Sequence, residues 1–362
     1  MEALAANPFH PQFGKRPEYF IGRDYIVRDF LCGLDNPNDP NRVTVVSGIR
    51  GSGKTALLTD VRDTLDSKRF AVVDVTAGPH FLQSVLDQLQ ADSPSAKRHV
   101  IGLNAGALGF SVGVATSVKE PEHGFRYHLT SLANELKSDG RGIVFLVDEV
   151  HRANDEMREL VITYQHLMRE NHDVALLMAG LPQSVSSVLN DKILTFLHRS
   201  NRVFLSGVDA MLTEDLFRRV FEKAEVGITE ETAAMAAKAT CGFPYLIQLL
   251  GYYLWKGKGE ALSRLDVERA LLNSKADLFR NIHALIMREL SAKDQAFLFA
   301  MAESGSSVSM AEMAARLQVS SGYAAKYRLR LIESGVVKAT GRGIISFDVP
   351  YMQEYLLRHS ES

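Results

Sequence analysis

The sequence has few cysteines, little net charge and no long apolar run. Its two cysteines, Cys32 and Cys241, are too few for a disulfide framework or a cysteine-based zinc site, so we expect a cytoplasmic protein. The formal net charge is −2, which restricts any nucleic-acid site to a local basic patch. No apolar run approaches the ~20 residues that span a bilayer. Residues 1–16 do not show the basic and apolar segments of a signal peptide.

The composition, 46% hydrophobic and 23% charged over 362 residues, is that of a globular protein with two or three domains. Within residues 1–206, short apolar runs alternate with helical patterns, which predicts a parallel sheet covered on both faces. The expected strands are 42–47, 70–75, 143–147, 174–178 and 203–205. The expected helices are 54–67, 80–90 and 156–170.

Residues 207–290 contain no strand pattern and predict an all-α domain. We expect its helices at 213–225, 229–240, 244–255 and 266–273, with Thr213 and Thr229 as N-caps of the first two.

Residues 291–362 predict a winged-helix domain. A capping box at 309–312 begins a helix, a second helix runs to about Ser334, and strands at 336–340 and 344–348 form a hairpin. Residues 100–118 fit neither pattern. Their glycines and their alternation with a period of two predict a β-hairpin inserted into the α/β domain.

Residues 48–55 carry the phosphate-loop motif GIRGSGKT between a predicted strand and a predicted helix. Glycines allow main-chain N–H groups to surround phosphate oxygens, and the helix N-terminus adds its positive dipole end. Lys54 is expected to reach the β- and γ-phosphates, and the Thr55 hydroxyl to bind Mg²⁺. The residues expected to hold ATP here are Gly48, Arg50, Gly51, Ser52, Gly53, Lys54, Thr55 and Ala56.

Asp148 and Glu149 follow a run of apolar residues that predicts a central strand. The carboxyl end of such a strand delivers its side chains to the ligand-binding edge of the sheet. We expect Asp148 to hold the metal and Glu149 to orient and deprotonate the attacking water. Two acids at the start of a helix are the alternative interpretation.

These two motifs and the helical segment after the sheet resemble the AAA+ ATPases, close to the origin-initiator and STAND branches. The stretch from Met178 to Pro182 is also similar to transposition-regulator ATPases. The resemblance implies an α/β P-loop core, an all-α lid and a frequent winged-helix companion. It places Gly22 and Arg23 beside the adenine and Pro244, within Gly-Phe-Pro, against the base.

The resemblance also implies an arginine finger before the last strand, which by spacing is Arg199, acting in a homo-oligomer. Surface arginines are the alternative for Arg199 and Arg202. No polar sensor residue occurs at the end of the fourth strand, where Met178 to Gly180 stand.

The second helix of the 291–362 unit carries a candidate DNA-binding face. The segment from Ser320 to Gly343 has five cations against Glu333, a local charge of +4. Cations on such a helix and at a wing tip can hold phosphates of duplex DNA. The candidate residues are Tyr323, Lys326, Arg328, Arg330 and Arg342. A protein-docking role for this domain remains open.

Three functions fit these motifs. The first is an ATP-binding and ATP-hydrolysing AAA+ switch that assembles into oligomers and acts on DNA. The second is a STAND-like signalling or defence regulator that docks a protein partner, and the third is a chaperone-type ATPase. The biological process, the DNA sequence, the oligomer number and the hydrolysis rate are not readable from the residues.

Overall fold

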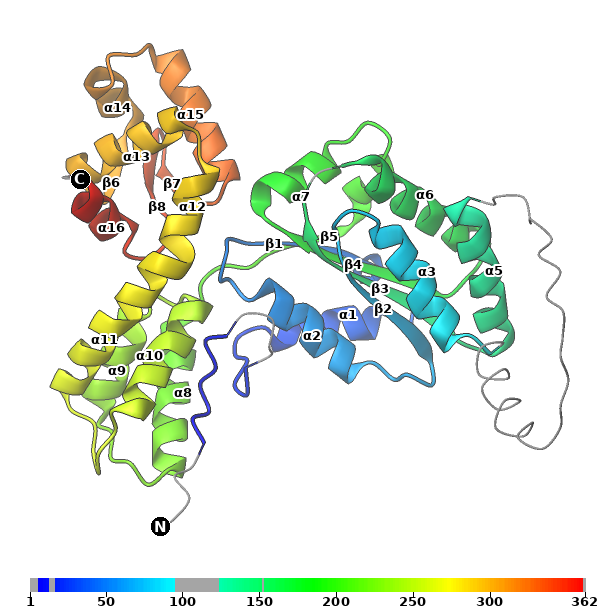
Figure 1. Cartoon of the computed structure of the whole chain (residues 1–362), viewed down its shortest axis with the longest axis horizontal. Helices are drawn as coiled ribbons and strands as arrows, with labels where there is room; N and C mark the ends of the chain where they lie inside the picture. The colour runs from blue at the N-terminus through cyan, green and yellow to red at the C-terminus, as the bar shows by residue number, and fades with distance from the viewer. Residues whose placement is uncertain (1–5, 13–16, 95–123, 152, 361–362) are drawn as a thin grey trace, which may run out of the picture.

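The computed structural model describes residues 6–12, 17–94, 124–151 and 153–360 (Figure 1). The hairpin predicted at 100–118 lies outside these residues. Across the described ranges, none of the helices combines the length and the apolar character needed to cross a membrane.

A five-stranded parallel sheet forms the centre of the first domain, with the strand order β2-β3-β4-β1-β5. The strands are β1 (Val43–Ser47), β2 (Phe70–Thr76), β3 (Gly142–Val150), β4 (Val174–Gly180) and β5 (Asn201–Phe204). The side chains of β4 are all buried, because helices cover both faces of the sheet. The predicted α/β class is therefore confirmed.

Helices α1 and α2 pack on one face of the sheet, and α3, α5 and α6 on the other (Figure 1). Their bounds are α1 (Asp24–Gly33), α2 (Lys54–Thr64), α3 (Phe81–Asp92), α5 (Phe125–Ser138) and α6 (Asp155–Arg169). Helix α7 (Pro182–Leu189) and the 3₁₀ helix η2 (Thr195–Arg199) connect β4 to β5. The sequence analysis predicted α2, α3 and α6 but not α1, α5 or α7.

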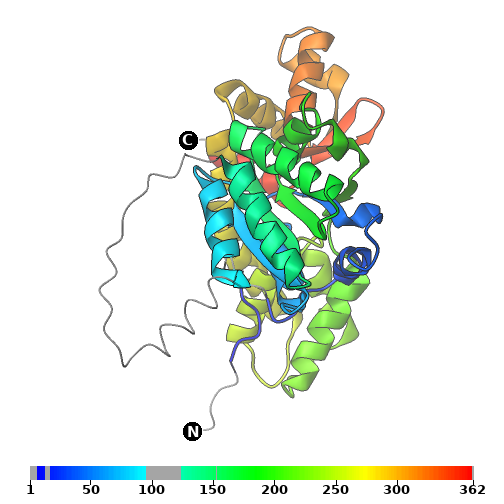
Figure 2. The same cartoon turned by 90° about the vertical axis from the view of Figure 1, so that its right-hand side faces the viewer.

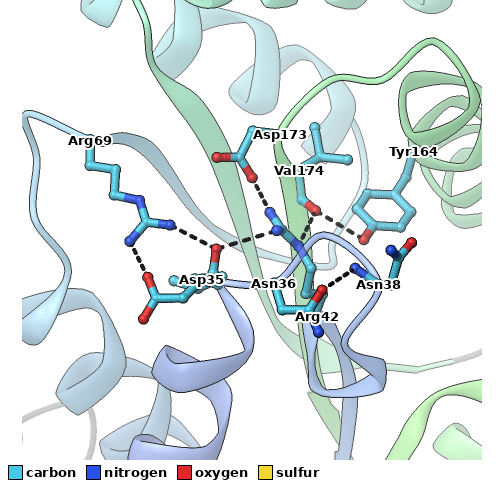
Figure 3. Close-up of polar contacts among 9 residues, drawn as sticks. Asp35, Asn36, Asn38, Arg42, Arg69, Tyr164, Asp173 and Val174 are labelled. Carbon is cyan, nitrogen blue, oxygen red and sulfur yellow. Dashed lines mark hydrogen bonds and ion pairs between the residues drawn. The ribbon is translucent and has the colours of Figure 1, made fainter.

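A buried arginine fixes the amino ends of the central strands, opposite the edge where ligands bind. Arg42 ends the 3₁₀ helix η1 (Pro40–Arg42) and is only 4% exposed. Its guanidinium donates to the carbonyls of Val174 and Leu34 at 3.3 Å and pairs with the carboxylate of Asp173 (Figure 3). Strands β1 and β4 and the end of α1 are thereby tied to one another.

Four helices form the lid, as expected for an all-α segment: α8 (Ala210–Lys223), α9 (Glu230–Ala239), α10 (Pro244–Lys256) and α11 (Arg264–Leu278). Thr229 caps α9 by accepting from Thr232 N at 3.1 Å, as predicted. The prediction for Thr213 was wrong, because α8 begins earlier and Asp209 accepts from Met211 N at 2.8 Å. The Thr213 hydroxyl is buried and donates to the Asp209 carbonyl.

The helical path continues from α11 through a π-helical turn, η3 (Phe279–His283), into α12 (Ala284–Glu289) and the C-terminal unit. That unit contains α13 (Ala292–Ser304), β6 (Ser307–Ser309), α14 (Met310–Arg316), α15 (Ser321–Glu333), β7 (Val337–Gly341), β8 (Ile344–Phe347) and α16 (Met352–His359). Its antiparallel sheet has the order β6-β8-β7. In both views this unit lies above the lid (Figure 1, Figure 2).

Candidate nucleotide site

The loop between β1 and α2 has the backbone that a phosphate loop requires. Gly51 and Gly53 have φ angles of 79° and 91°, in the left-handed region that favours glycine. A Cβ at Gly51 would also lie 2.8 Å from the ring of Phe243, the N-cap of the lid helix α10. The loop therefore curls around a space at the N-terminus of α2, where main-chain N–H groups can meet an anion.

Lys54 occupies the inside of this loop. Its ammonium donates to the carbonyls of Gly48 at 2.8 Å and Ile49 at 3.0 Å. Burial lowers the pKa of Lys54 to about 8, against the opposing influence of the Asp148 carboxylate. A polyanion bound in the loop would stabilise the charged form, so the lysine is placed to gain a phosphate partner.

Asp148, at the carboxyl end of β3, meets the first turn of α2. The Thr55 hydroxyl donates to Asp148 Oδ2 at 2.6 Å, although the two residues are 93 positions apart. The other carboxylate oxygen accepts from the main-chain N–H of Glu149 at 2.7 Å. A hydroxyl and a carboxylate are oxygen donors of the type that Mg²⁺ binds together with nucleotide phosphates. The residues present therefore fit that metal.

Glu149 adopts a strained backbone beside this pair. Its φ of 51° interrupts the pairing of β3 with β4, whose register shifts between Val147 and Val150. Its side chain is exposed and faces the same cavity as Lys54. Backbone strain of this kind is typical of functional positions. In a regular strand the side chain of Glu149 would point to the face of the sheet opposite that of Asp148.

A cavity of about 210 Å³ runs from the phosphate loop to the lid. It brings together most of the predicted residues, namely Arg23, Arg50, Gly51, Gly53, Lys54, Thr55, Ala56, Asp148, Glu149 and Pro244. Gly22, Gly48, Ser52 and Arg199 were predicted as site residues and do not line it. Gly22 packs on Val208, and a Cβ at Gly48 would lie 2.4 Å from Ser52 Oγ, so Gly22, Gly48 and Ser52 shape the loops behind the cavity.

Arg23, the N-cap of α1, is buried beside the segment that joins β5 to α8. Its guanidinium donates to the Ser206 carbonyl, and burial lowers its pKa. Within the described residues its Nε atom has no hydrogen-bond partner. Arg23 lines the cavity and thus connects the cavity wall to the segment between β5 and α8.

The sequence analysis missed three groups of lining residues. The first is the N-terminal segment, represented by His10, Pro11 and Gln12, and the second is the η3–α12 region, with Asn281, Ile282 and Leu285. The third consists of the lid residues Val208, Tyr245, Ile247 and Gln248. None of these groups has a motif or periodicity that marks it. Each reaches the cavity only through tertiary packing.

The sequence analysis also concerned the sensor position at the end of β4 and the arginines before β5. A Cβ at Gly180 would lie 2.6 Å from the Val150 carbonyl, so no sensor side chain can occupy that position. Arg199 ends η2 and is exposed, outside the cavity of its own chain. Arg202 is exposed on β5 and donates to the His198 carbonyl at 3.2 Å.

The candidate DNA-binding face of α15 is partly exposed. Tyr323, Lys326 and Arg330 lie on one side of the helix and are open to solvent, as is Arg342 at the turn between β7 and β8. Arg328 is half-buried, and its Nε lacks a partner among the described residues.

Two aspartates outside the segment from Ser320 to Gly343 reduce its positive charge. Asp294 on α13 pairs with Arg330, and Asp348 lies 3.1 Å from Lys338. Lys326 and Arg342 are the strongest remaining candidates for phosphate contacts, because no ion pair is shown for either within the described residues.

Comparison with known proteins agrees with this geometry. Residues 38–189 match the family model of the AAA domain. Residues 280–356 match a domain of unknown function. No curated protein matches the chain.

Among solved structures, the Walker-type ATPase PABY2304 of Pyrococcus abyssi is similar over 94% of this chain and 97% of its own, with 16% identity and a TM-score of 0.67. Cdc6p of Pyrobaculum aerophilum matches over 96% of both chains with 13% identity and a TM-score of 0.48. The ORC2 protein of Aeropyrum pernix matches over 97% of this chain and 98% of its own, with 14% identity and a TM-score of 0.48. At 16% identity the similarity to the first of these structures shows the fold alone.

Proposed function

We propose that the protein is a nucleotide-driven switch that binds and hydrolyses ATP with Mg²⁺. The observation that carries the proposal is the hydrogen bond of 2.6 Å between Thr55 and Asp148, which joins the phosphate loop to the acidic end of β3. Lys54 would hold the β- and γ-phosphates, and Thr55 and Asp148 would hold the metal. Mg²⁺ supplies charge neutralisation of the phosphates when bound. Glu149 would take the proton of the attacking water.

Binding of ATP to wild-type protein and to Lys54→Ala tests this function. A charge-assisted contact to phosphate contributes about 2–3 kcal/mol, so the variant should bind roughly 30- to 150-fold more weakly in calorimetry. Lys68→Ala, a change of an exposed lysine outside the cavity, is the matched control. Equal affinity in Lys54→Ala and wild type would overturn the assignment of the phosphate site.

Contacts between the phosphate loop and the C-terminal half support a switch. Arg50 pairs with Glu289 at the end of α12. Tyr245 donates its main-chain N–H to Gly51 O at 3.2 Å, and its hydroxyl accepts from Asn281 at 2.9 Å. These contacts hold the start of α10, η3 and the end of α12 close to the phosphate loop.

Ile49 makes a further contact, with the turn after α15. A Cβ at Gly335 would lie 2.4 Å from Ile49 Cγ2, so the two surfaces meet without space for a side chain. Phosphates that enter the loop would compete with Glu289 for Arg50 and would displace Lys54 from the carbonyl of Ile49. ATP would in this way bias the docking of the C-terminal unit.

The proposed switch includes assembly through Arg199. The exposed position of this arginine, outside its own cavity, leaves it available to the site of a neighbouring subunit in a homo-oligomer. Mixing Arg199→Ala with Lys54→Ala chains should then restore ATP turnover, because an intact Lys54 site can face an intact Arg199. Co-assembly without any restored turnover would contradict a shared site.

The second part of the proposal is that residues 291–362 act as a winged helix on duplex DNA, supported by the exposure of Lys326 and Arg342. Removal of one phosphate contact should flatten the log–log salt dependence of DNA affinity by roughly 0.9. Lys326→Ala/Arg342→Ala should therefore flatten it by nearly two units, while Arg28→Ala/Lys68→Ala should not. Wild-type protein without salt-sensitive DNA binding in any nucleotide state would favour the alternative, a signalling or defence regulator whose winged helix docks a protein.

A further inference from the structure

The base end of the cavity is built by the N-terminal segment, which folds across helix α10. Phe9 is fully buried against the lid rings Phe217 and Phe221, with centroids 5.9 and 6.1 Å away. Gly251 provides the space for this ring, because a Cβ there would lie 2.2 Å from Phe9 Cδ1. The segment is therefore anchored by one large side chain in a slot on α10.

Gln248 lies one turn before Gly251 on α10. Its side chain hydrogen-bonds two stretches of the N-terminal region, one at residues 6–12 and one that begins at residue 17. Its amide oxygen accepts from the main-chain N–H of His10 at 3.0 Å. Its amide nitrogen donates to the carbonyl of Tyr19 at 3.4 Å. The side chain is 9% exposed, so both bonds are largely shielded from water. One buried amide thus bridges two stretches of chain that approach the cavity separately.

Both stretches line the cavity. His10 to Gln12 and Tyr19 to Ile21 belong to its lining, together with Ile247 and Gln248 itself. Apolar side chains together with main-chain polar groups suit a flat heteroaromatic ring whose edge carries donors and acceptors. The wall exists in this form only while the two stretches stay in place.

We propose that Gln248 is a positioning residue for the base of the bound nucleotide. It sets the spacing of the two stretches and so the fit of the purine, while taking no part in phosphate binding. This inference rests on the proposed ATP site, but it concerns a different end of the cavity. Its effect should therefore appear with nucleotides and be absent with the phosphate chain alone.

The test compares ATP, GTP and inorganic tripolyphosphate, each with Mg²⁺, by calorimetry on the full chain. Gln248→Met keeps the length of the side chain and removes both hydrogen bonds. Gln353→Met is the matched control, since Gln353 donates to the Ala302 carbonyl at 2.9 Å inside the C-terminal unit. Asn7→Ala is a milder second variant, because Asn7 donates to the Tyr252 carbonyl at 3.1 Å and tethers the same segment.

Gln248→Met should lower ATP affinity about tenfold and narrow the preference between ATP and GTP. Its tripolyphosphate affinity should stay within about twofold of wild type, which also shows that the variant is folded. Asn7→Ala should lower the ratio of ATP affinity to tripolyphosphate affinity in the same way, by about threefold. Gln353→Met should change neither ligand's affinity.

Equal reductions in affinity for ATP and tripolyphosphate in Gln248→Met and Asn7→Ala would overturn the inference, because a structural role weakens both ligands alike. Unchanged ATP affinity in both variants would overturn it as well. Wild-type protein that binds tripolyphosphate as tightly as ATP would show that no base subsite exists and would leave the phosphate site intact. Wild-type protein that binds neither would overturn the proposed function and this inference together.

Discussion

The proposed phosphate end and the proposed base end of the cavity are built in different ways. The phosphate end consists of one continuous loop and two adjacent carboxylic acids, positioned by the central strands β1 and β3. The base end, as proposed above, is assembled from the stretches around His10 and Tyr19 and from Ile247 and Gln248 of α10, which are far apart in the chain. Phosphate binding should therefore depend on local backbone geometry, and base binding on the packing of the N-terminal stretches against the lid.

This difference explains why a sequence motif identifies the first end and not the second. Gly51 and Gly53 are required by the backbone itself, so the motif carries its own geometry. Gln248 shows no such signature, because it works through the main-chain groups of His10 and Tyr19. Substitutions at the two ends should therefore affect different properties of the protein.

The largest expected effect is on turnover. Glu149→Gln should retain ATP affinity within about threefold, because the residue does not hold phosphates. Its kcat should fall by about 100-fold or more, since an amide cannot accept the proton of water. Single-turnover hydrolysis measured beside calorimetry separates the two quantities. Equal loss of affinity and turnover would assign Glu149 another role.

At the base end, the next largest effect is on stability. Phe9→Ala removes a fully buried ring from the lid core and should lower the free energy of unfolding of the lid by about 3–5 kcal/mol. Tyr25→Ala, at a residue that is 50% exposed, should stay within about 0.5 kcal/mol. Denaturant unfolding provides the measurement. A Phe9 variant as stable as the Tyr25 variant would show that the N-terminal segment is not anchored.

The smallest effect is a pH dependence confined to the phosphate end. Burial lowers the pKa of Lys54 from 10.5 to about 8. In the protein without nucleotide, the Lys54 ammonium therefore loses its proton as the pH rises above 8. Phosphate binding favours the charged form, which means that ATP affinity should fall by about tenfold between pH 7 and pH 9. Lys54→Arg, which stays charged over this range, should bind with little pH dependence. A fall of the same size in both proteins would place the titrating group elsewhere.

Prediction from the sequence was best where the local pattern and the tertiary role coincide. The five strands are short apolar runs that fill the sheet centre, and their existence follows from that pattern. The sequence analysis missed the start of α8, which is capped by Asp209. Met211 and Leu212 in the first turn are apolar but exposed, so the pattern of apolar residues does not indicate where the helix begins. The ion pair of Arg330 with Asp294 could not be foreseen either, since it joins two helices of the C-terminal unit.

The contact of α12 with the phosphate loop could not be predicted from the sequence either. Arg50 was expected to contact phosphate, and the structure adds its pairing with Glu289 on a helix more than 200 residues away. Nothing in the residues around Glu289 indicates a nucleotide site. The cavity is thus lined by the sheet domain, by the lid and by the η3–α12 region that leads to the C-terminal unit.

Hydrogen–deuterium exchange of the wild-type protein, with and without ATP and Mg²⁺, tests this three-part cavity most directly. The account predicts slower exchange on ATP binding in the loop at 48–56 and in the segment at 17–23. It predicts faster exchange at the end of α12 around Glu289, because phosphates compete with this residue for Arg50. Tripolyphosphate with Mg²⁺ should protect the loop without protecting 17–23. Protection limited to the loop with ATP, or no protection in any region, would contradict the account.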